Sequence, residues 1–164
     1  EIVARDTDIV MQVCTAGNLR TTLLCAEMAR KHGAFERFLI ATDTPTGSGV
    51  MPLGLIYTIS QIASLTSFEV PELIAAATGN VAKCYGLNSG FLKPSFDADI
   101  VLIDAPLGGT QVDALAALKN GDPCAIGAVI TAGVPRFVGR SNNTPPPIRE
   151  IKVLRSNVIN VFQG

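Results

Sequence analysis

Short apolar runs and a helical pattern alternate in the first third of the chain. Residues 8–13 form a mostly apolar run of strand length, and residues 38–41, Phe-Leu-Ile-Ala, form a second one. Residues 19–31 between them carry apolar side chains at helical spacing. The predicted inward face of this helix consists of Leu19, Leu23, Leu24 and Met28. A strand, a helix and a strand joined by short links predict a right-handed βαβ unit in a parallel sheet.

Polar residues at both ends support this helix. Asn18 stands immediately before it, where an Asn side chain caps the free backbone N–H groups of the first turn. Arg30, Lys31 and His32 fall at its last turn, where basic side chains suit the helix dipole. Gly33 follows and can adopt the left-handed conformation that ends many helices.

The pattern stays helical as far as Gly86 and then changes to strands. Apolar spacing predicts helices over residues 53–65, 70–77 and 81–85, the second with Pro71 in its first turn. Beyond Gly90 the sequence predicts strands over residues 98–104, 125–131 and 134–138, and short helices over 112–119 and 148–154. Ala132-Gly133, between the last two strands, indicates a hairpin turn.

This order of elements predicts two regions and a tail. Residues 1–90 have the pattern of an α/β portion. Residues 91–140 carry three strands of the kind found in a β-sandwich. Residues 141–164 begin with a stretch of Ser, Asn, Thr and Pro that resists regular structure, and we interpret them as a tail.

The composition indicates apolar surface that needs to be covered by another surface. Of 164 residues, 48% are hydrophobic and 16% are charged, against a usual charged fraction of about 25%. The mean hydropathy is +0.36. The cover would be either another part of the same protein or a second subunit. The sequence also begins with Glu instead of Met, from which we expect that it starts inside a longer protein.

Charge and aromatic content argue against nucleic-acid and membrane partners. The net charge is −1 and no run of Lys or Arg is present. Trp is absent and the two Tyr lie far apart in the sequence, so base-stacking platforms are not expected. No apolar run reaches the roughly 20 residues that span a membrane, and the first residues do not form a signal peptide. We therefore expect a small-molecule partner.

The cysteines favour a reducing compartment. Cys14, Cys25, Cys84 and Cys124 form no Cys-x-x-Cys pair. The favoured interpretation is four reduced cytoplasmic thiols that serve mostly as small core residues. A zinc site is the less favoured alternative, because the spacings are wrong and His32 is the only histidine.

Asp43 is the strongest candidate for chemistry. It follows the apolar run 38–41 and lies in a loop that reads Thr42-Asp43-Thr44-Pro45-Thr46-Gly47-Ser48-Gly49. Enzymes of the α/β class place their chemistry at the carboxyl ends of parallel strands. A carboxylate there serves as metal ligand and general base, or it forms an Asx turn that caps the strand. The local pattern leaves both interpretations open.

Other polar residues give weaker signals. The loop residues Thr46, Gly47, Ser48 and Gly49 would let backbone N–H groups converge on a substrate carboxylate or oxyanion, although such loops are common. His32 lies at a helix end, which favours capping or solvent exposure and excludes a Ser-His-Asp or Cys-His arrangement built from this chain. We expect turn roles for Asp97 and Asp99, and solvated side chains for Lys83 and Lys93.

Three segments together resemble the amidohydrolase superfamily of metal-dependent hydrolases. Residues 38–45 are similar to its last barrel strand with its Asp, and residues 77–87, which contain Ala-Thr-Gly-Asn-Val-Ala, to the helix pair that follows. Residues 90–104 resemble the strand that re-enters the small domain. The loop at residues 47–54 and the stretch at residues 143–146 resemble the enamidase branch, which opens a cyclic enamide.

The resemblance implies a fold and a mechanism. The fold would be the last strands and helices of a (β/α)8 TIM-type barrel followed by part of a small β-sandwich domain. The activity would be hydrolysis of a carbon–nitrogen bond in a cyclic amide by metal-activated hydroxide, with zinc and/or iron as the divalent metal. Of the metal ligands in the family only the last-strand Asp maps here, onto Asp43. The resemblance implies that Asp43 binds metal and shuttles the proton from hydroxide to the leaving nitrogen.

The chain also departs from the pattern of the family. It has no His-x-His, it offers at most two of the eight barrel strands, and a full barrel needs about 250 residues. Ser95 stands where the family usually has Gly. We therefore expect a carboxyl-terminal part that does not hold the metal alone and is inactive alone, completed by an amino-terminal barrel part or by a homo-oligomer. The alternatives are a dihydroorotase-, imidazolonepropionase- or deacetylase-like amidohydrolase, or a non-catalytic assembly module.

Overall fold

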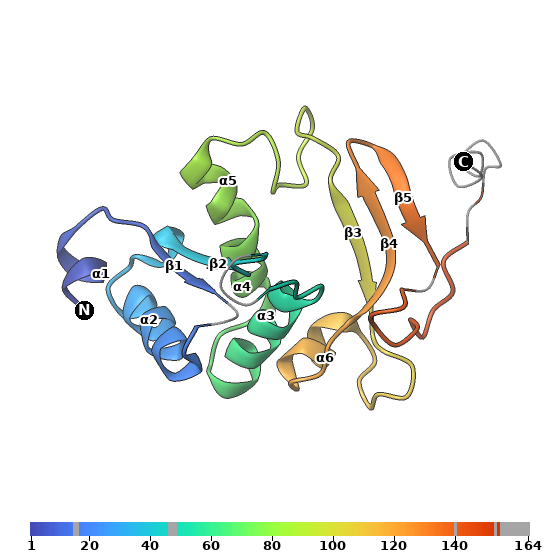
Figure 1. The fold of residues 1–164 in the computed structure, drawn as a ribbon, viewed down its shortest axis with the longest axis horizontal. Helices are drawn as coiled ribbons and strands as arrows, with labels where there is room; N and C mark the ends of the chain where they lie inside the picture. Colours follow the sequence, from blue (N-terminus) through green and yellow to red (C-terminus); the bar gives the residue numbers. More distant parts are fainter. Residues whose placement is uncertain (15–16, 46–48, 140, 153, 155–164) are drawn as a thin grey trace.

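The structure, a computed structural model, describes residues 1–14, 17–45, 49–139, 141–152 and 154. Its elements form two groups that lie side by side along the longest axis (Figure 1). The first group contains α1 (Ile2–Asp6), β1 (Met11–Cys14), α2 (Leu19–Lys31), a 3-10 turn (Phe35–Arg37), β2 (Phe38–Ala41), α3 (Gly54–Leu65), α4 (Val70–Ala77) and α5 (Gly79–Tyr85). The second group contains β3 (Ile100–Asp104), α6 (Ala114–Lys119), β4 (Ala125–Thr131) and β5 (Val134–Val138).

The predicted strand–helix–strand unit is confirmed. β1 and β2 pair in parallel, with Val13 opposite Ile40. The helix between them, α2, has the predicted bounds, and Asn18 Oδ1 accepts a hydrogen bond from Thr21 N at 3.0 Å, as an N-cap should. The first strand lies slightly later in the sequence than the predicted residues 8–13.

The predicted inward face of α2 is wrong in part. Its buried residues are Thr22, Ala26 and Ala29, whereas Leu19 and Leu24 are exposed. Small side chains at these positions let the helix axis approach its neighbours closely, and the leucines then lie outside the contact face. The spacing of the leucines therefore predicted the wrong buried face for this helix.

One apolar core joins the two groups. Phe38 and Ile40 of β2 pack in the same cluster as Ile62 of α3, and Leu118 of α6 and Cys124 belong to it as well. Helix α6 lies against α3 and α4, between the two groups (Figure 1). The division of the chain near Gly90 stays a prediction, because α6 follows Gly90 in the sequence and yet packs in the core of the first group.

The second group is built on a small antiparallel sheet. Its strand order is β3-β4-β5, and β4 and β5 have the predicted bounds. Ala132 and Gly133 both have positive φ angles, 50° and 76°, which is the geometry of a tight hairpin turn. Asp99 Oδ1 accepts a hydrogen bond from Ala132 N at 2.8 Å and holds this turn against the start of β3.

The predicted helix over residues 148–154 is wrong, because none of its described residues is helical. Backbone groups of this stretch bond to another segment instead. Ile148 N donates to Ala105 O at 3.1 Å, and Leu107 N donates to Pro146 O at 2.8 Å. Arg149 N also donates to Asp104 Oδ2 at 3.0 Å, so partners distant in the sequence decide the conformation here.

Large apolar side chains are exposed on several elements. Leu92 is 86% exposed, Val101 of the edge strand β3 is 52% exposed, and Val112 is 75% exposed. Among the described residues, no helix is both long and apolar enough to cross a bilayer. The apolar surface predicted from composition is present, and it lies on loops, on an edge strand and on helices such as α2, where Leu24 is 54% exposed.

Candidate functional site

Asp43 lies just beyond the carboxyl end of β2, as the sequence pattern predicted. The strand before it is buried, with Phe38, Leu39 and Ile40 at most 2% exposed. Because β1 and β2 are parallel, their carboxyl ends meet at one edge, where Cys14 stands opposite Ala41. Asp43 is exposed at this edge.

The backbone at Asp43 adopts a left-handed conformation with φ of 59°. Residues with a Cβ seldom adopt it, although Asp tolerates it better than most. Beside it, Thr42 Oγ1 accepts a hydrogen bond from Thr44 N at 3.2 Å, which tightens the turn after the strand. Such conformations cost about 1–3 kcal/mol and cluster at functional sites. The geometry supports Asp43 as a candidate, and its chemical role stays a prediction.

The loop after Asp43 is described only at its end. Thr46, Gly47 and Ser48 lie outside the described residues. Gly49 is exposed, has a φ of 73°, and has open space where a Cβ would stand. A glycine is favoured there by its backbone angle and not by crowding. The predicted substrate contacts of this loop stay predictions.

A small surface pocket of about 260 Å³ lies where the chain enters α3. Its lining residues are Met51, Pro52, Leu53, Gly54, Tyr57 and Asn143. It brings together the two segments, residues 47–54 and 143–146, that resemble the enamidase branch. These segments are far apart in the sequence, so the structure gives a physical reason for treating them as one feature.

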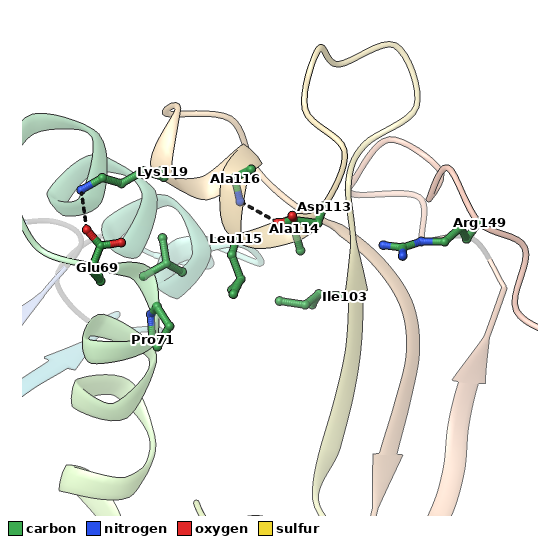
Figure 2. Close-up of a pocket in the computed structure, with 10 residues that line it drawn as sticks. Glu69, Pro71, Ile103, Asp113, Ala114, Leu115, Ala116, Lys119 and Arg149 are labelled. Carbon is green, nitrogen blue, oxygen red and sulfur yellow. Dashed lines mark hydrogen bonds and ion pairs between the residues drawn. The ribbon is translucent and has the colours of Figure 1, made fainter.

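A larger pocket, of about 640 Å³, lies between α4, α6 and β3 (Figure 2). Its charged side chains already have partners: Asp113 accepts a hydrogen bond from Ala116 N, and Lys119 lies 3.9 Å from Glu69. Arg149 binds Asp104 at the opposite wall. Asp43 lines neither pocket. The Lys119–Glu69 pair joins the two groups of elements, and the other two interactions hold α6 and the segment of Arg149 in place, so we assign this pocket a structural role.

The described residues do not form a metal centre by themselves. Among them no three His, Cys, Asp or Glu side chains cluster closely enough to hold a metal ion. His32 is the C-cap residue of α2, and its backbone N–H donates to Arg30 O and Met28 O. Its side chain is only 15% exposed, so capping is confirmed and solvent exposure is wrong. Asp43 thus has no set of ligands around it within this part of the chain.

All four cysteines are free thiols. Cys124 is buried, and the loss of solvent raises the pKa of its thiol to about 11, so it stays protonated and inert. Cys84 is exposed, which contradicts the predicted core role for that residue. The remaining two, Cys14 and Cys25, are half-buried.

The turn roles predicted for two acidic residues are confirmed. Asp97 Oδ1 accepts a hydrogen bond from Asn88 Nδ2 at 3.3 Å, and Asp99 holds the hairpin turn described above. Lys83 and Lys93 are exposed, and Lys83 lies 3.4 Å from Glu36. The side chains of Asp97, Asp99 and Lys83 therefore make structural contacts with nearby groups.

The sequence pattern missed the pairing of Asp104 with Arg149. Asp104 ends β3 in a buried position and accepts hydrogen bonds from Ala105 N and from the backbone and guanidinium of Arg149. The Arg149 guanidinium, with help from the backbone N–H groups, lowers the pKa of the carboxyl to about 2 against the cost of burial. A carboxylate at the end of a strand is the same local signal as at Asp43, and the burial of Asp104 against a distant arginine does not show in the local sequence.

The comparisons with other proteins agree with one another. The profile of the amidohydrolase family matches residues 2–137. The chain is 36% identical to the enamidase of Eubacterium barkeri over 149 residues, which are 91% of this chain and 38% of that protein. It is 32% identical to a 5-methylthioadenosine/S-adenosylhomocysteine deaminase 1 of Archaeoglobus fulgidus over 103 residues, which are 56% of this chain and 23% of that protein.

Solved structures give the same assignment. The crystal structure of an enamidase, a member of the amidohydrolase superfamily, superposes with a TM-score of 0.88 and 35% identity, covering 93% of this chain and 40% of that one. A β-aspartyl dipeptidase from Fervidobacterium islandicum AW-1 has a TM-score of 0.52 and 16% identity over 88% of this chain and 35% of that one, and so shares the fold alone. This chain spans 38% to 40% of the enamidases. Its mixed α/β fold matches theirs, and the chain belongs to the amidohydrolase family.

Proposed function

We propose that this chain is the carboxyl-terminal part of a hydrolase that cleaves a carbon–nitrogen bond in a cyclic amide. The observation that carries the proposal is the 36% identity to an enamidase over 91% of the chain, a match that includes the segment with Asp43 at the end of a parallel strand. Because the chain spans 38% of that relative, the activity is proposed for the complete protein and not for the chain alone.

In the complete protein, residues 1–90 would supply the last strands and helices of a (β/α)8 barrel. Residues 91–140 would supply part of a small β-sandwich, and residues 141–164 would form a tail. The parallel β1-α2-β2 unit supports the first assignment, because such units build barrels. The separate antiparallel sheet β3-β4-β5 supports the second.

We assign the proton transfer to Asp43. Its carboxylate would accept a proton from the attacking water and deliver it to the leaving nitrogen, which needs an acid–base group that is ionised near neutral pH. Asp43 would also be one ligand of a divalent metal, zinc and/or iron, which when bound lowers the pKa of water and polarises the amide carbonyl. The described residues hold no ligand cluster, so the remaining ligands would come from outside this chain.

The loop of Thr46, Gly47, Ser48 and Gly49 would contact the substrate beside Asp43. Backbone N–H groups of such a loop can bind a carboxylate or a developing oxyanion. The left-handed φ of Gly49 supports this assignment, because a left-handed residue is one of the conformations that build such an anion-binding turn.

The test is hydrolysis of cyclic amides by the complete protein and its Asp43→Asn variant. Asn keeps the size of the side chain and removes the base. We expect kcat to fall by about 10²–10⁴-fold, the usual contribution of a general acid–base group. Asp97→Asn is the matched control, because Asp97 is an exposed carboxylate with a turn role. An Asp43→Asn protein with unchanged kcat would remove Asp43 from the mechanism.

A second candidate follows from the 32% identity to the deaminase. Its substrates, 5-methylthioadenosine and S-adenosylhomocysteine, would then lose an amino group by hydrolysis, which also breaks a carbon–nitrogen bond. The same preparations assayed with both substrate classes decide between the two. Turnover of the nucleosides without turnover of cyclic amides would replace the enamidase-like assignment.

A further inference from the structure

Asn80 lies in the first turn of α5, beside the strand that leads to Asp43. Its side chain is buried, and Nδ2 donates to Phe35 O at 2.9 Å and to Phe38 O at 3.2 Å. These carbonyls lie on either side of the point where the 3-10 turn becomes β2. Both hydrogens of one amide group are therefore used to hold the start of a single strand.

The start of β2 determines where its carboxyl end stands. Among the described residues, β2 is four residues long and pairs with β1 alone, with Phe38 opposite Met11. A close-packed interior transmits strain, so a displacement at one end of a short strand affects its other end. Asp43 follows two residues after the strand, so a shift at Phe38 is carried to the carboxylate at the other end.

Close packing around the turn between α4 and α5 holds Asn80 in place. A Cβ on Gly79 would lie 3.0 Å from the ring of Phe91, and a Cβ on Gly90 would lie 2.8 Å from Thr78 O. The chain that crosses to the small sheet therefore packs directly on the first turn of α5. α4 and α5 in turn lie against β2 (Figure 1). The stretch Thr78-Gly79-Asn80 thus links the small sheet to the strand of Asp43.

We propose that Asn80 is a positioning residue for Asp43: its side-chain amide fixes the start of β2 and thereby the place of the carboxylate. The proposal rests on the proposed function for its catalytic consequence. Its structural part, the hold on β2, stands on the two hydrogen bonds. The Asn80 side chain is 7% exposed, so water has little access to replace its two hydrogen bonds.

Asn80→Asp is the sharpest variant, because it keeps the shape and replaces the donor nitrogen by an oxygen that faces two carbonyl oxygens. In the complete protein, we expect hydrogen exchange of the backbone over residues 38–41 to become about tenfold faster or more. Ser60→Ala is the matched control. Ser60 is buried in α3, and its Oγ donates a hydrogen bond to Asp122 O at 3.3 Å, a contact that does not involve β2.

The kinetic readout separates positioning from general destabilisation. We expect Asn80→Asp to lower kcat by about tenfold to a hundredfold with KM little changed, the effect of a misplaced catalytic group. Ser60→Ala should change neither kcat nor KM, even where it lowers stability as much.

Two results would overturn the proposal. Unchanged exchange over residues 38–41 in Asn80→Asp would show that the amide does not hold β2, and unchanged kcat with faster exchange would show that holding β2 does not place Asp43. Asn80→Ala, which removes the donor without adding a charge, gives the same decision where Asn80→Asp does not fold. The proposed function fails separately, through an active Asp43→Asn protein, so the two failures are distinguishable.

Discussion

Asp43 and Asp104 both follow an apolar strand, yet their surroundings differ. Asp104 is buried and accepts hydrogen bonds from Ala105 and Arg149, so its charge holds two segments together. Asp43 is exposed, and its backbone has a φ of 59°. The residue type is the same at both strand ends, and the burial of the two carboxylates differs.

Ser95 carries a strain that a single substitution should relieve. Its φ is 72°, in the left-handed region that favours glycine. We expect Ser95→Gly to raise the free energy of unfolding by about 0.5–1 kcal/mol, because relief of the left-handed strain exceeds the extra chain entropy of glycine. Urea unfolding measures the change.

The control for that substitution is Ser64→Gly. Ser64 lies in the last turns of α3 and is exposed, so glycine there removes helix propensity and relieves no strain. We expect a loss of about 0.5 kcal/mol. If both substitutions destabilise the protein, the backbone of Ser95 is not strained and its departure from the family is neutral.

At the scale of elements, the sequence predicted the features that interactions between neighbouring residues determine. The bounds of α2, β2 and β4 follow from caps, apolar runs and turn residues that lie within a few positions of each element. The buried face of α2 and the conformation of residues 148–154 could not be predicted from such local signals. Both depend on partners distant in sequence: the elements that pack on Ala26, and the Ala105 carbonyl that accepts from Ile148.

The Asp104–Arg149 pair makes the attachment of that segment dependent on pH. Hydrogen bonds from Arg149 lower the pKa of Asp104 from 3.8 to about 2, despite its burial. A carboxyl with a lowered folded-state pKa stabilises the fold above its unfolded pKa, and this contribution disappears as the pH falls from about 4 to 2. We expect Asp104→Asn to lower the free energy of unfolding by about 1–3 kcal/mol near pH 7.

The difference between Asp104→Asn and the natural chain should shrink as the pH falls through that window. Urea unfolding at several pH values measures it. Asp97→Asn is the control, because Asp97 is exposed and its change should stay within about 0.5 kcal/mol. A constant difference between the Asp104→Asn and natural chains down to the lowest pH would mean that packing, and not the charge, is what the substitution removes.

At the scale of the whole molecule, the sequence predicted the position of Asp43 but not a complete site. An apolar run followed by a polar loop is readable from neighbouring residues, and parallel pairing of β1 and β2 placed the loop at the expected edge. The loop residues Thr46, Gly47 and Ser48 lie outside the described residues, and no ligand cluster surrounds Asp43 within the described part. Asn80 was part of a recognisable motif, but its hold on Phe38 depends on a contact between residues 42 positions apart.

The exposed apolar side chains lead to a prediction about the chain in solution. Leu92, Val101 and Val112 are more than half exposed, and Val101 lies on β3, an edge strand of the described sheet, a position that favours pairing with another chain. We expect the 164-residue chain to bind a hydrophobic dye or to self-associate. Val101→Lys should weaken both effects, because a charge on an edge strand opposes pairing, whereas Thr110→Lys adds the same charge outside the strand and should not. Light scattering and dye fluorescence measure the outcome, and a monodisperse monomer without dye binding would show that this surface needs no cover.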